Sequence, residues 1–226
     1  MKNKGKVSKL LKVLSIFLII GVVITTSLVV YADNVTSTLS GSIVRLHVIA
    51  NSNTPEDQGL KLKVRDKIVE YMKDELQTSQ SAGESMERIN NDLPEIEKIA
   101  LDVITEEGSS YPVKASVGRS AFPMKNYGDV TLPAGNYQAL KVVIGSGSGQ
   151  NWWCVLFPPL CFVDTQSAVV TDDGKKLLQD ELPEGSYNLI TSGDNGDVKV
   201  KAKFKIVDIV ESSKNKIQSA IASWFK

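Results

Sequence analysis

The sequence predicts a mixed α/β (α+β) protein, in which an N-terminal signal or anchor segment precedes one exported domain with a mostly antiparallel sheet. Three observations lead to this prediction. An uncharged apolar run covers residues 13–30, helical hydrophobic patterns lie between residues 54 and 108, and segments typical of strands flank them. Apolar residues make up 42% and charged residues 23% of the 226 residues, which is typical of a globular protein.

The first 32 residues are expected to direct export. Five lysines, at positions 2, 4, 6, 9 and 12, precede the apolar run. A helix over that run would be roughly 27 Å long, close to the thickness of a membrane's hydrocarbon core. The lysines are expected to stay in the cytoplasm while the following chain crosses. Residues 30–32 (VYA) form a small-x-small pattern just before Asp33, so that both a cleaved signal peptide and a retained signal anchor fit.

The remaining chain is predicted to have three parts. Residues 33–41 are small and polar and are expected to form a tether. An α/β domain is expected over residues 42–170. Residues 171–226 are expected to form a C-terminal extension with a strand and an amphipathic helix. The sequence contains no internal repeat.

The domain is expected to open with a strand over residues 42–50, followed by a helix with Thr54 as N-cap and Pro55 in its first turn, running to about residue 77. A second helical pattern is expected to break near Asp92 and Pro94 and to stop at Gly108. Alternation predicts a strand over 111–120 and a strand pair, 130–132 and 137–144, around a turn at 133–135.

The second half of the chain follows the glycine- and serine-rich segment 145–149, which is expected to be a flexible linker or a hairpin loop. A short helix is predicted over residues 172–182, ended by the residues from Pro183 to Gly185. Beyond a turn at 193–196, alternating residues predict a strand over 198–206, and the last segment, about 208–226, has the pattern of an amphipathic helix.

Charge and composition exclude several classes of function. The chain has 26 basic and 26 acidic residues, but five of the lysines lie in residues 1–32, which leaves a net charge of −5 on the rest. This net negative charge argues against a nucleic-acid partner, because proteins that bind nucleic acids neutralise phosphates with a basic face. One histidine and two cysteines are too few for a zinc site of these ligands. We therefore expect no metal, no cofactor, no small-molecule substrate and no catalytic residue.

Two segments have alternative interpretations. His47 can be a structural histidine, the favoured interpretation, or a catalytic base beside a Ser or Cys nucleophile. Residues 145–149 (GSGSG) are only superficially similar to a phosphate-binding loop, because no Gly-Lys-Ser/Thr sequence follows them.

The segment 152–164 (WWCVLFPPLCFVD) is the most informative part of the sequence. Its cysteines, Cys154 and Cys161, would lie about 10 Å apart on a helix and about 23 Å apart on a strand, both too far for a disulfide. A turn at Phe157 and Pro158 would bring them together, and an exported chain can keep the bridge oxidised. Two buried thiols are the alternative.

The same segment is too apolar for every large side chain to point inward from a tight turn. It is either a partner-binding surface with exposed aromatic residues or a hairpin packed on the sheet. The side chains concerned are Trp152, Trp153, Phe157, Leu160 and Phe162.

Several motifs resemble those of the stage II sporulation protein R family of endospore-forming bacteria. The resemblance covers roughly residues 43–165, and its most specific part is GQNWWCVLFPPLC at residues 149–161. The supporting motifs are RLHVIANS at 45–52, PEDQ at 55–58, LKLKVRD at 60–66, YG at 127–128, LPAG at 132–135 and YQAL at 137–140.

The resemblance implies a protein made in the forespore and exported into the space between the two membranes. There it would activate an integral-membrane aspartic protease of the stage II sporulation GA type, which processes the pro-form of mother-cell sigma factor E. We therefore expect a non-enzymatic signalling protein. The alternatives are an exported hydrolase of the cell wall and a passive envelope-binding module.

The contact with the protease is expected on the first strand and on the apolar segment, next to the membrane that the N-terminal segment reaches. The expected partner-binding residues are Arg45, His47, Asn51, Trp152, Trp153, Phe157, Pro158 and Leu160.

Overall fold

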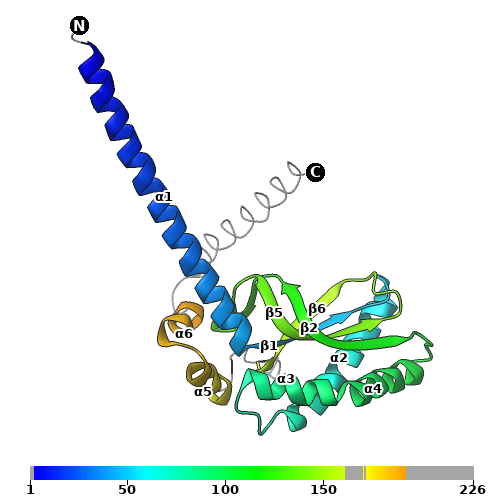
Figure 1. Cartoon of the computed structure of the whole chain (residues 1–226). Helices are drawn as coiled ribbons and strands as arrows, with labels where there is room; N and C mark the ends of the chain where they lie inside the picture. Colours follow the sequence, from blue (N-terminus) through cyan, green and yellow to red (C-terminus); the bar gives the residue numbers. More distant parts are fainter. Residues whose placement is uncertain (1–2, 161–169, 171, 192–226) are drawn as a thin grey trace. The chain divides into compact units, whose positions relative to one another are not determined.

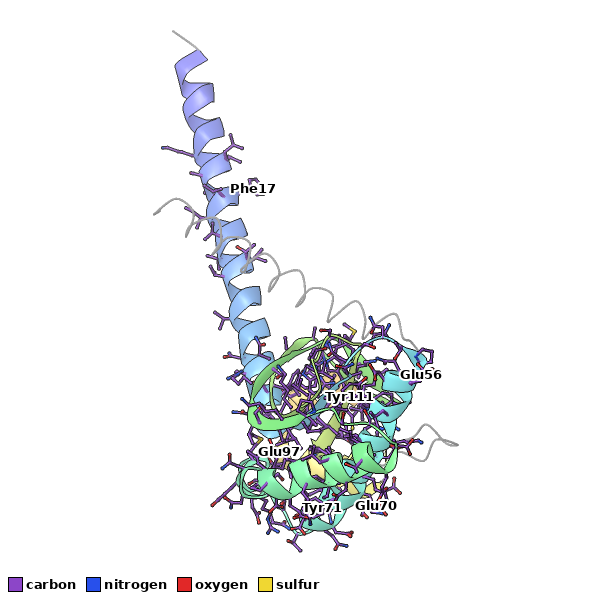
Figure 2. All side chains as sticks on the ribbon, turned by 90° about the vertical axis from the view of Figure 1, so that its right-hand side faces the viewer. Phe17, Glu56, Glu70, Tyr71, Glu97 and Tyr111 are labelled. Carbon is purple, nitrogen blue, oxygen red and sulfur yellow. The ribbon has the colours of Figure 1, made fainter. Side chains whose placement is uncertain are left out.

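The computed structural model describes residues 3–160, 170 and 172–191, and it divides into two units, residues 1–36 with 202–226 and residues 37–201. Helix α1 (Asn3–Ser42) supplies the described part of the first unit. Side chains of the apolar run stand out from it, as Phe17 does in Figure 2. Phe17 is 68% exposed. Among the described residues, no helix combines the length and the hydropathy needed to span a membrane.

The segment expected to form a tether is helical. Helix α1 continues through residues 33–42, the last six of which belong to the second unit. No proline interrupts this segment, and Leu39 and Ser40 are buried, so that packing stabilises the added turns. The small, polar composition of the segment had not indicated a helix.

The first strand and helix of the domain agree with the prediction. Strand β1 (Val44–Ile49) is almost fully buried. Helix α2 (Pro55–Glu75) begins after Thr54, whose hydroxyl accepts a hydrogen bond from the Asp57 N–H at 3.3 Å. An N-cap bond of this kind satisfies one of the free N–H groups of the first turn.

The second helical pattern is broken as expected, into α3 (Ala82–Asn91) and α4 (Leu93–Glu106). Asp92 lies at the break but makes no side-chain cap hydrogen bond. Gly108 follows α4 with a φ of 74°, a backbone conformation that glycine adopts without strain.

A four-stranded sheet has the order β2-β5-β1-β6, with β2 (Val113–Phe122), β5 (Gly135–Ile144) and β6 (Asn151–Phe157) beside β1. The pairs β2–β5 and β1–β6 are antiparallel, whereas β1–β5 is parallel. The mostly antiparallel sheet that the sequence predicts is confirmed.

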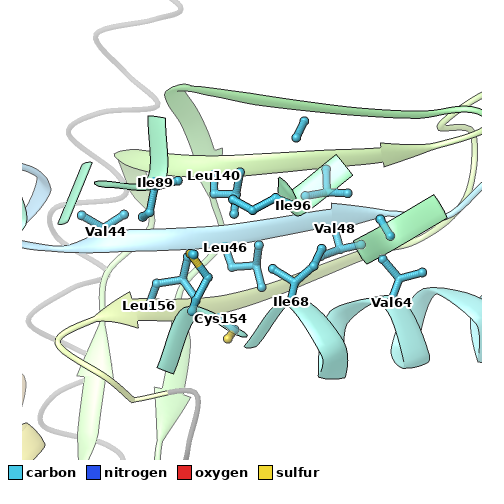
Figure 3. Packing of buried hydrophobic residues seen from close by; sticks show 14 of the residues in the cluster. Val44, Leu46, Val48, Val64, Ile68, Ile89, Ile96, Leu140, Cys154 and Leu156 are labelled. Carbon is cyan, nitrogen blue, oxygen red and sulfur yellow. The ribbon is translucent and has the colours of Figure 1, made fainter. Parts of the chain in front are cut away.

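Helices α2, α3 and α4 cover one face of this sheet (Figure 1). Figure 3 shows Leu46 and Val48 of β1 lying with Val64 and Ile68 of α2 in the buried cluster between the layers. Each of these four side chains is fully buried, and burying an aliphatic side chain contributes about 1.5–3 kcal/mol to folding.

One strand pairing was predicted wrongly. Strand β4 (Val130–Leu132) pairs with β3 (Lys125–Tyr127) in a separate two-stranded sheet, and not with β5. Tyr127 pairs with Val130 across the two-residue turn Gly128-Asp129, and Gly128 has a φ of 65°. Such a turn closes a hairpin between β3 and β4. The prediction had instead placed the hairpin turn at Pro-Ala-Gly, after β4.

Two helices follow the sheets. Helix α5 (Asp172–Glu181) was predicted, whereas α6 (Glu184–Thr191) was not. Pro183 was read as a terminator, but its carbonyl accepts hydrogen bonds from Ser186 at 2.8 Å and Tyr187 at 3.0 Å and so begins α6. The predicted strand 198–206, the predicted helix 208–226, Cys161 and Phe162 lie outside the described residues.

Candidate functional site

The sheet face away from α2–α4 carries charged and aromatic side chains. Successive residues of a strand point to opposite faces, so that Arg45 and His47 lie on the face opposite Leu46. Tyr137 and Trp153, on the strands β5 and β6 beside β1, and Phe122 on β2 surround them. We call this set, with Tyr127 and Lys125 from β3, the aromatic–basic cluster.

Arg45 is completely buried at the centre of the aromatic–basic cluster. Its Nη2 donates a hydrogen bond to the Tyr127 hydroxyl at 2.8 Å. The guanidinium carbon lies 4.1 Å from the centroid of the Phe122 ring and 4.9 Å from that of Tyr137. Nε and Nη1 have no hydrogen-bond partner, and none of the ion pairs among the described residues includes Arg45.

His47 lies two residues further along the same face and is 9% exposed. Its ring stacks on Trp153, with centroids 6.0 Å apart, and tilts against Phe122 at 5.8 Å. Burial lowers the pKa of His47, and the positive charge of Lys141 lowers the pKa further. The side chain that affects this imidazole through a hydrogen bond is the Asn151 amide, which partly opposes the lowering of the pKa, so that no carboxylate orients the ring as in a nucleophile–base pair.

The consecutive tryptophans of β6 point to opposite faces. Trp153 pairs with His47 and its indole Nε1 is buried without a partner, while the Lys125 Nζ lies 5.5 Å from its ring centroid. Trp152 pairs with Val48 on the helix side and is 36% exposed. The Arg65 guanidinium of α2 covers its ring at 4.1 Å. One flat surface therefore cannot contain both tryptophans, although a partner that wraps the edge of β6 can contact both.

The other apolar residues expected at the contact are buried. Phe157 and Leu160 are each 1% exposed, and the Leu160 N–H donates to the Pro158 carbonyl at 2.7 Å, where the chain turns. Cys154 is buried, and Cys161 lies outside the described residues, so that the disulfide stays a prediction.

Asn51 has a structural role that the sequence did not indicate. Its amide donates to the Asp57 carboxylate at 2.9 Å, and its side-chain oxygen accepts from the Ser146 N–H at 3.0 Å. The Ser52 hydroxyl, first, and then Asn51 lower the pKa of Asp57 through hydrogen bonds to its carboxylate. Asn51 thereby joins the start of α2 to the glycine-rich loop.

The glycine-rich loop is a hydrogen-bonded connection and not a flexible linker. Every backbone N–H from Gly145 to Gln150 donates to an acceptor within the protein. These acceptors are the carbonyls of Ala50, Asn51, Pro112 and Ile144 and the side-chain oxygens of Asn51 and Asn53. A phosphate cradle needs free N–H groups, so that the loop does not provide one.

A shallow hollow of about 420 Å³ lies beside the start of α2. Figure 2 labels Glu56 and Tyr111, two of the residues that line it. Asp57 and Glu107 make this lining acidic, with Lys63 the one basic residue among the lining side chains. In the described part of the chain, no group of three His, Cys, Asp or Glu side chains is placed to hold a metal ion.

Comparisons with known proteins identify the family. The model of the family "Stage II sporulation protein R" matches residues 40–167, which include the aromatic–basic cluster, the glycine-rich loop and both cysteines. Stage II sporulation protein R of Bacillus subtilis (strain 168) is 37% identical over 133 residues, which are 59% of this chain and 59% of that protein. No solved structure matches the chain. The chain belongs to the stage II sporulation protein R family.

Proposed function

We propose that this protein is an exported signal of sporulation that activates a membrane-embedded aspartic protease of the stage II sporulation GA type. The protease in turn processes the pro-form of mother-cell sigma factor E. The observation that carries this proposal is the family match over residues 40–167, which supports a role in sporulation. The lysine-flanked apolar run before residue 31 supports export from the forespore into the intermembrane space.

The proposed contact lies around the edge strand β6. Trp152, on a strand that the structure describes, is a large apolar side chain that is 36% exposed, and Arg65 lies over its ring. Tryptophan and arginine supply much of the binding energy in protein interfaces, because each buries a large area and also forms directed polar contacts. Phe157 and Leu160 support β6 from within and contribute to the contact by holding it in place.

The proposed role is that of an activator and not of an enzyme. The protein binds the active conformation of the protease more tightly than the inactive one and so raises the population of the active form. The geometry of His47 supports this proposal over a cell-wall hydrolase, because its imidazole has no acidic partner and is held between aromatic rings.

Reconstitution in a non-sporulating bacterium tests the proposal. The host expresses the protease and the pro-sigma factor together with the full chain, and immunoblotting measures processing of the pro-sigma factor. A chain lacking residues 1–32 stays in the cytoplasm and should give no processing. The exported Trp152→Ala variant should give much less processing than the unchanged chain.

Leu101→Ala is the matched control, because Leu101 is an exposed apolar residue on α4, 41% exposed, away from β6. It should leave processing unchanged. Equal processing by the exported and the cytoplasmic chains would contradict a signal acting outside the cytoplasm. If the Leu101 variant lost as much processing as the Trp152 variant, the assignment of the contact to β6 would be wrong.

A further inference from the structure

The aromatic–basic cluster contains buried hydrogen-bond donors that the protein itself does not use. Arg45 has five N–H donors, one of which donates to Tyr127, while Nε and Nη1 have no partner. The Trp153 indole N–H is likewise buried without a partner. Buried polar groups in folded proteins are almost always hydrogen-bonded, so that several unused donors on one face require an explanation.

The charge of Arg45 is the most unusual of these features. A buried guanidinium is normally paired with a carboxylate, because an unpaired charge in a protein interior is unfavourable. The nearby rings of Phe122 and Tyr137 offset part of this cost by cation–π interaction, and they supply no negative charge. Asp129, in the turn between β3 and β4, pairs with Lys175 at 2.6 Å and not with Arg45.

We propose that Arg45, with His47 and Trp153, forms a binding site for a carboxylate, and that the ligand is a glutamate or aspartate side chain of a peptide segment. A guanidinium binds a carboxylate through two parallel hydrogen bonds, and the orphan indole N–H adds a third donor on the same face. The two further cations of this face, Lys125 and Lys141, favour the approach of an anion.

The lining of the site selects a carboxylate on an apolar stem over a phosphate. One buried guanidinium supplies one positive charge, which a single carboxylate balances. A phosphate dianion generally requires several basic side chains or free backbone N–H groups at the same point. Phe122, Tyr137 and the Trp153 ring instead offer apolar contact to the methylene groups of a side chain.

The short hairpin β3–β4 provides the entrance. Tyr127 and Lys125 are only partly buried, and the hairpin forms a sheet of its own without ladder pairing to the main sheet. Movement of the hairpin therefore breaks no strand pairing of the main sheet. The Tyr127 hydroxyl, which binds Nη2 in the free protein, is the group that the carboxylate would displace or join.

Nuclear magnetic resonance of the full ¹⁵N-labelled chain tests this proposal. His47 is the single histidine of the chain, so that its imidazole signals need no assignment, and Trp153→Phe identifies the Trp153 indole signal among three tryptophans. The probes are the capped peptides Ac-Ala-Glu-Ala-NH₂ and Ac-Ala-Gln-Ala-NH₂, which differ only in the carboxylate. They are titrated at constant sodium chloride concentration.

The glutamate peptide should shift the His47 and Trp153 signals saturably, and the glutamine peptide should not. Arg45→Met, which keeps an unbranched apolar stem and removes the charge and the N–H donors, should raise the dissociation constant by about tenfold to a hundredfold. The same variant should melt at a higher temperature than the unchanged chain, because it removes an unpaired buried charge. Equal shifts with both peptides would overturn the proposal, as would unchanged binding by the Arg45 variant.

Two further probes distinguish the source of the anion. Sodium acetate should bind at the same signals but more weakly than the glutamate peptide, since it lacks the stem. Acetate binding as tight as that of the peptide would replace the peptide ligand by a free small carboxylate and so overturn that part of the proposal. Tighter binding of inorganic phosphate would overturn the ligand class. If the Arg45 variant does not fold, the comparison of the two peptides on the unchanged chain still tests whether the site binds a carboxylate.

Identification of the ligand as an acidic segment of the protease rests on the proposed function, whereas the titration uses no protease. Saturable binding of the glutamate peptide together with failed processing in the reconstituted host would contradict the proposed function alone. Normal processing without discrimination between the two peptides would contradict the carboxylate site alone.

Discussion

Gly149 lies so close to Ser52 that a Cβ atom on residue 149 would be 2.2 Å from the Ser52 carbonyl oxygen. The Ser52 carbonyl cannot move away freely, because the Gln58 amide donates to it at 2.8 Å. The Gly149 N–H also donates to the Ala50 carbonyl at 2.9 Å, which fixes the loop from its other side. The glycine-rich loop and the start of α2 are therefore packed at backbone contact, and this contact requires a residue without a side chain.

Gly149→Ala should lower the free energy of unfolding by about 1–3 kcal/mol, because the added methyl group meets backbone that hydrogen bonds hold in place. Urea denaturation measures the change. Gly118→Ala is the matched control, since a Cβ atom on Gly118 would meet no atom within 4 Å. Equal stability of the two variants would show that the loop adapts easily and is not rigidly held.

His47 should make the stability depend on pH in a defined direction. Burial lowers the pKa of His47 below 6.5, so that the unfolded chain takes up the proton at a higher pH than the folded chain. The free energy of unfolding should therefore fall as the pH falls from 6.5 towards the folded-state pKa, and should level off below it. Above 6.5 the contribution is fully present.

His47→Phe should remove this slope, because phenylalanine keeps an aromatic ring between Trp153 and Phe122 but does not titrate. Urea denaturation at closely spaced pH values between 5 and 7.5 provides the measurement. The pKa of Asp57 is also lowered, from 3.8, and its effect belongs to more acidic solutions. A slope that persists in the phenylalanine variant would mean that another group causes it.

Phe157→Ala and Trp152→Ala should differ strongly in stability. Phe157 is 1% exposed, and truncation of a buried phenylalanine costs about 3–5 kcal/mol. Trp152 is 36% exposed, and its cation–π contact with Arg65 is worth about 0.5–1 kcal/mol at such a site. Thermal denaturation of the two variants side by side checks the difference. Similar melting temperatures would mean that Phe157 is less firmly packed than its burial indicates.

A Cys154–Cys161 disulfide should stabilise the exported chain by about 2.5 kcal/mol, because it closes a short loop in the unfolded state. Mass spectrometry after alkylation without reductant should find both thiols protected, and reduction should lower the urea midpoint. Cys161→Ser should reproduce the effect of the reductant. Full alkylation of the chain purified from the exported fraction would contradict the bridge.

The sequence was sufficient for most of the framework, because its signals were local. Thr54 and Pro55 predicted the start of α2. The break before Pro94 predicted that α3 and α4 are separate helices, and the alternation after Tyr111 predicted β2. The errors came from competition between neighbouring signals. Gly128 closed a hairpin that the turn after Pro133 was expected to make.

The candidate site was less predictable, because its members meet only in the folded sheet. Arg45 and His47 were selected from their motif, yet their neighbours Phe122 and Tyr137 carry no pattern that relates them to β1 before the pairing is known. Asn51 and the glycine-rich loop are likewise far apart in sequence. The alternation of β6 could have predicted that Trp152 and Trp153 lie on opposite faces of the sheet, because consecutive side chains of a strand point to opposite faces.

The position of β1 at the centre of the sheet also governs when the sheet can form. This strand is the first to emerge during synthesis, but its two neighbours are residues 135–144 and 151–157, which emerge last among the strands of the sheet. Every pairing of β1 is thus of long range in sequence, and such topologies fold slowly. For a chain exported as proposed, the sheet can be completed around its central strand only after β6 has crossed the membrane.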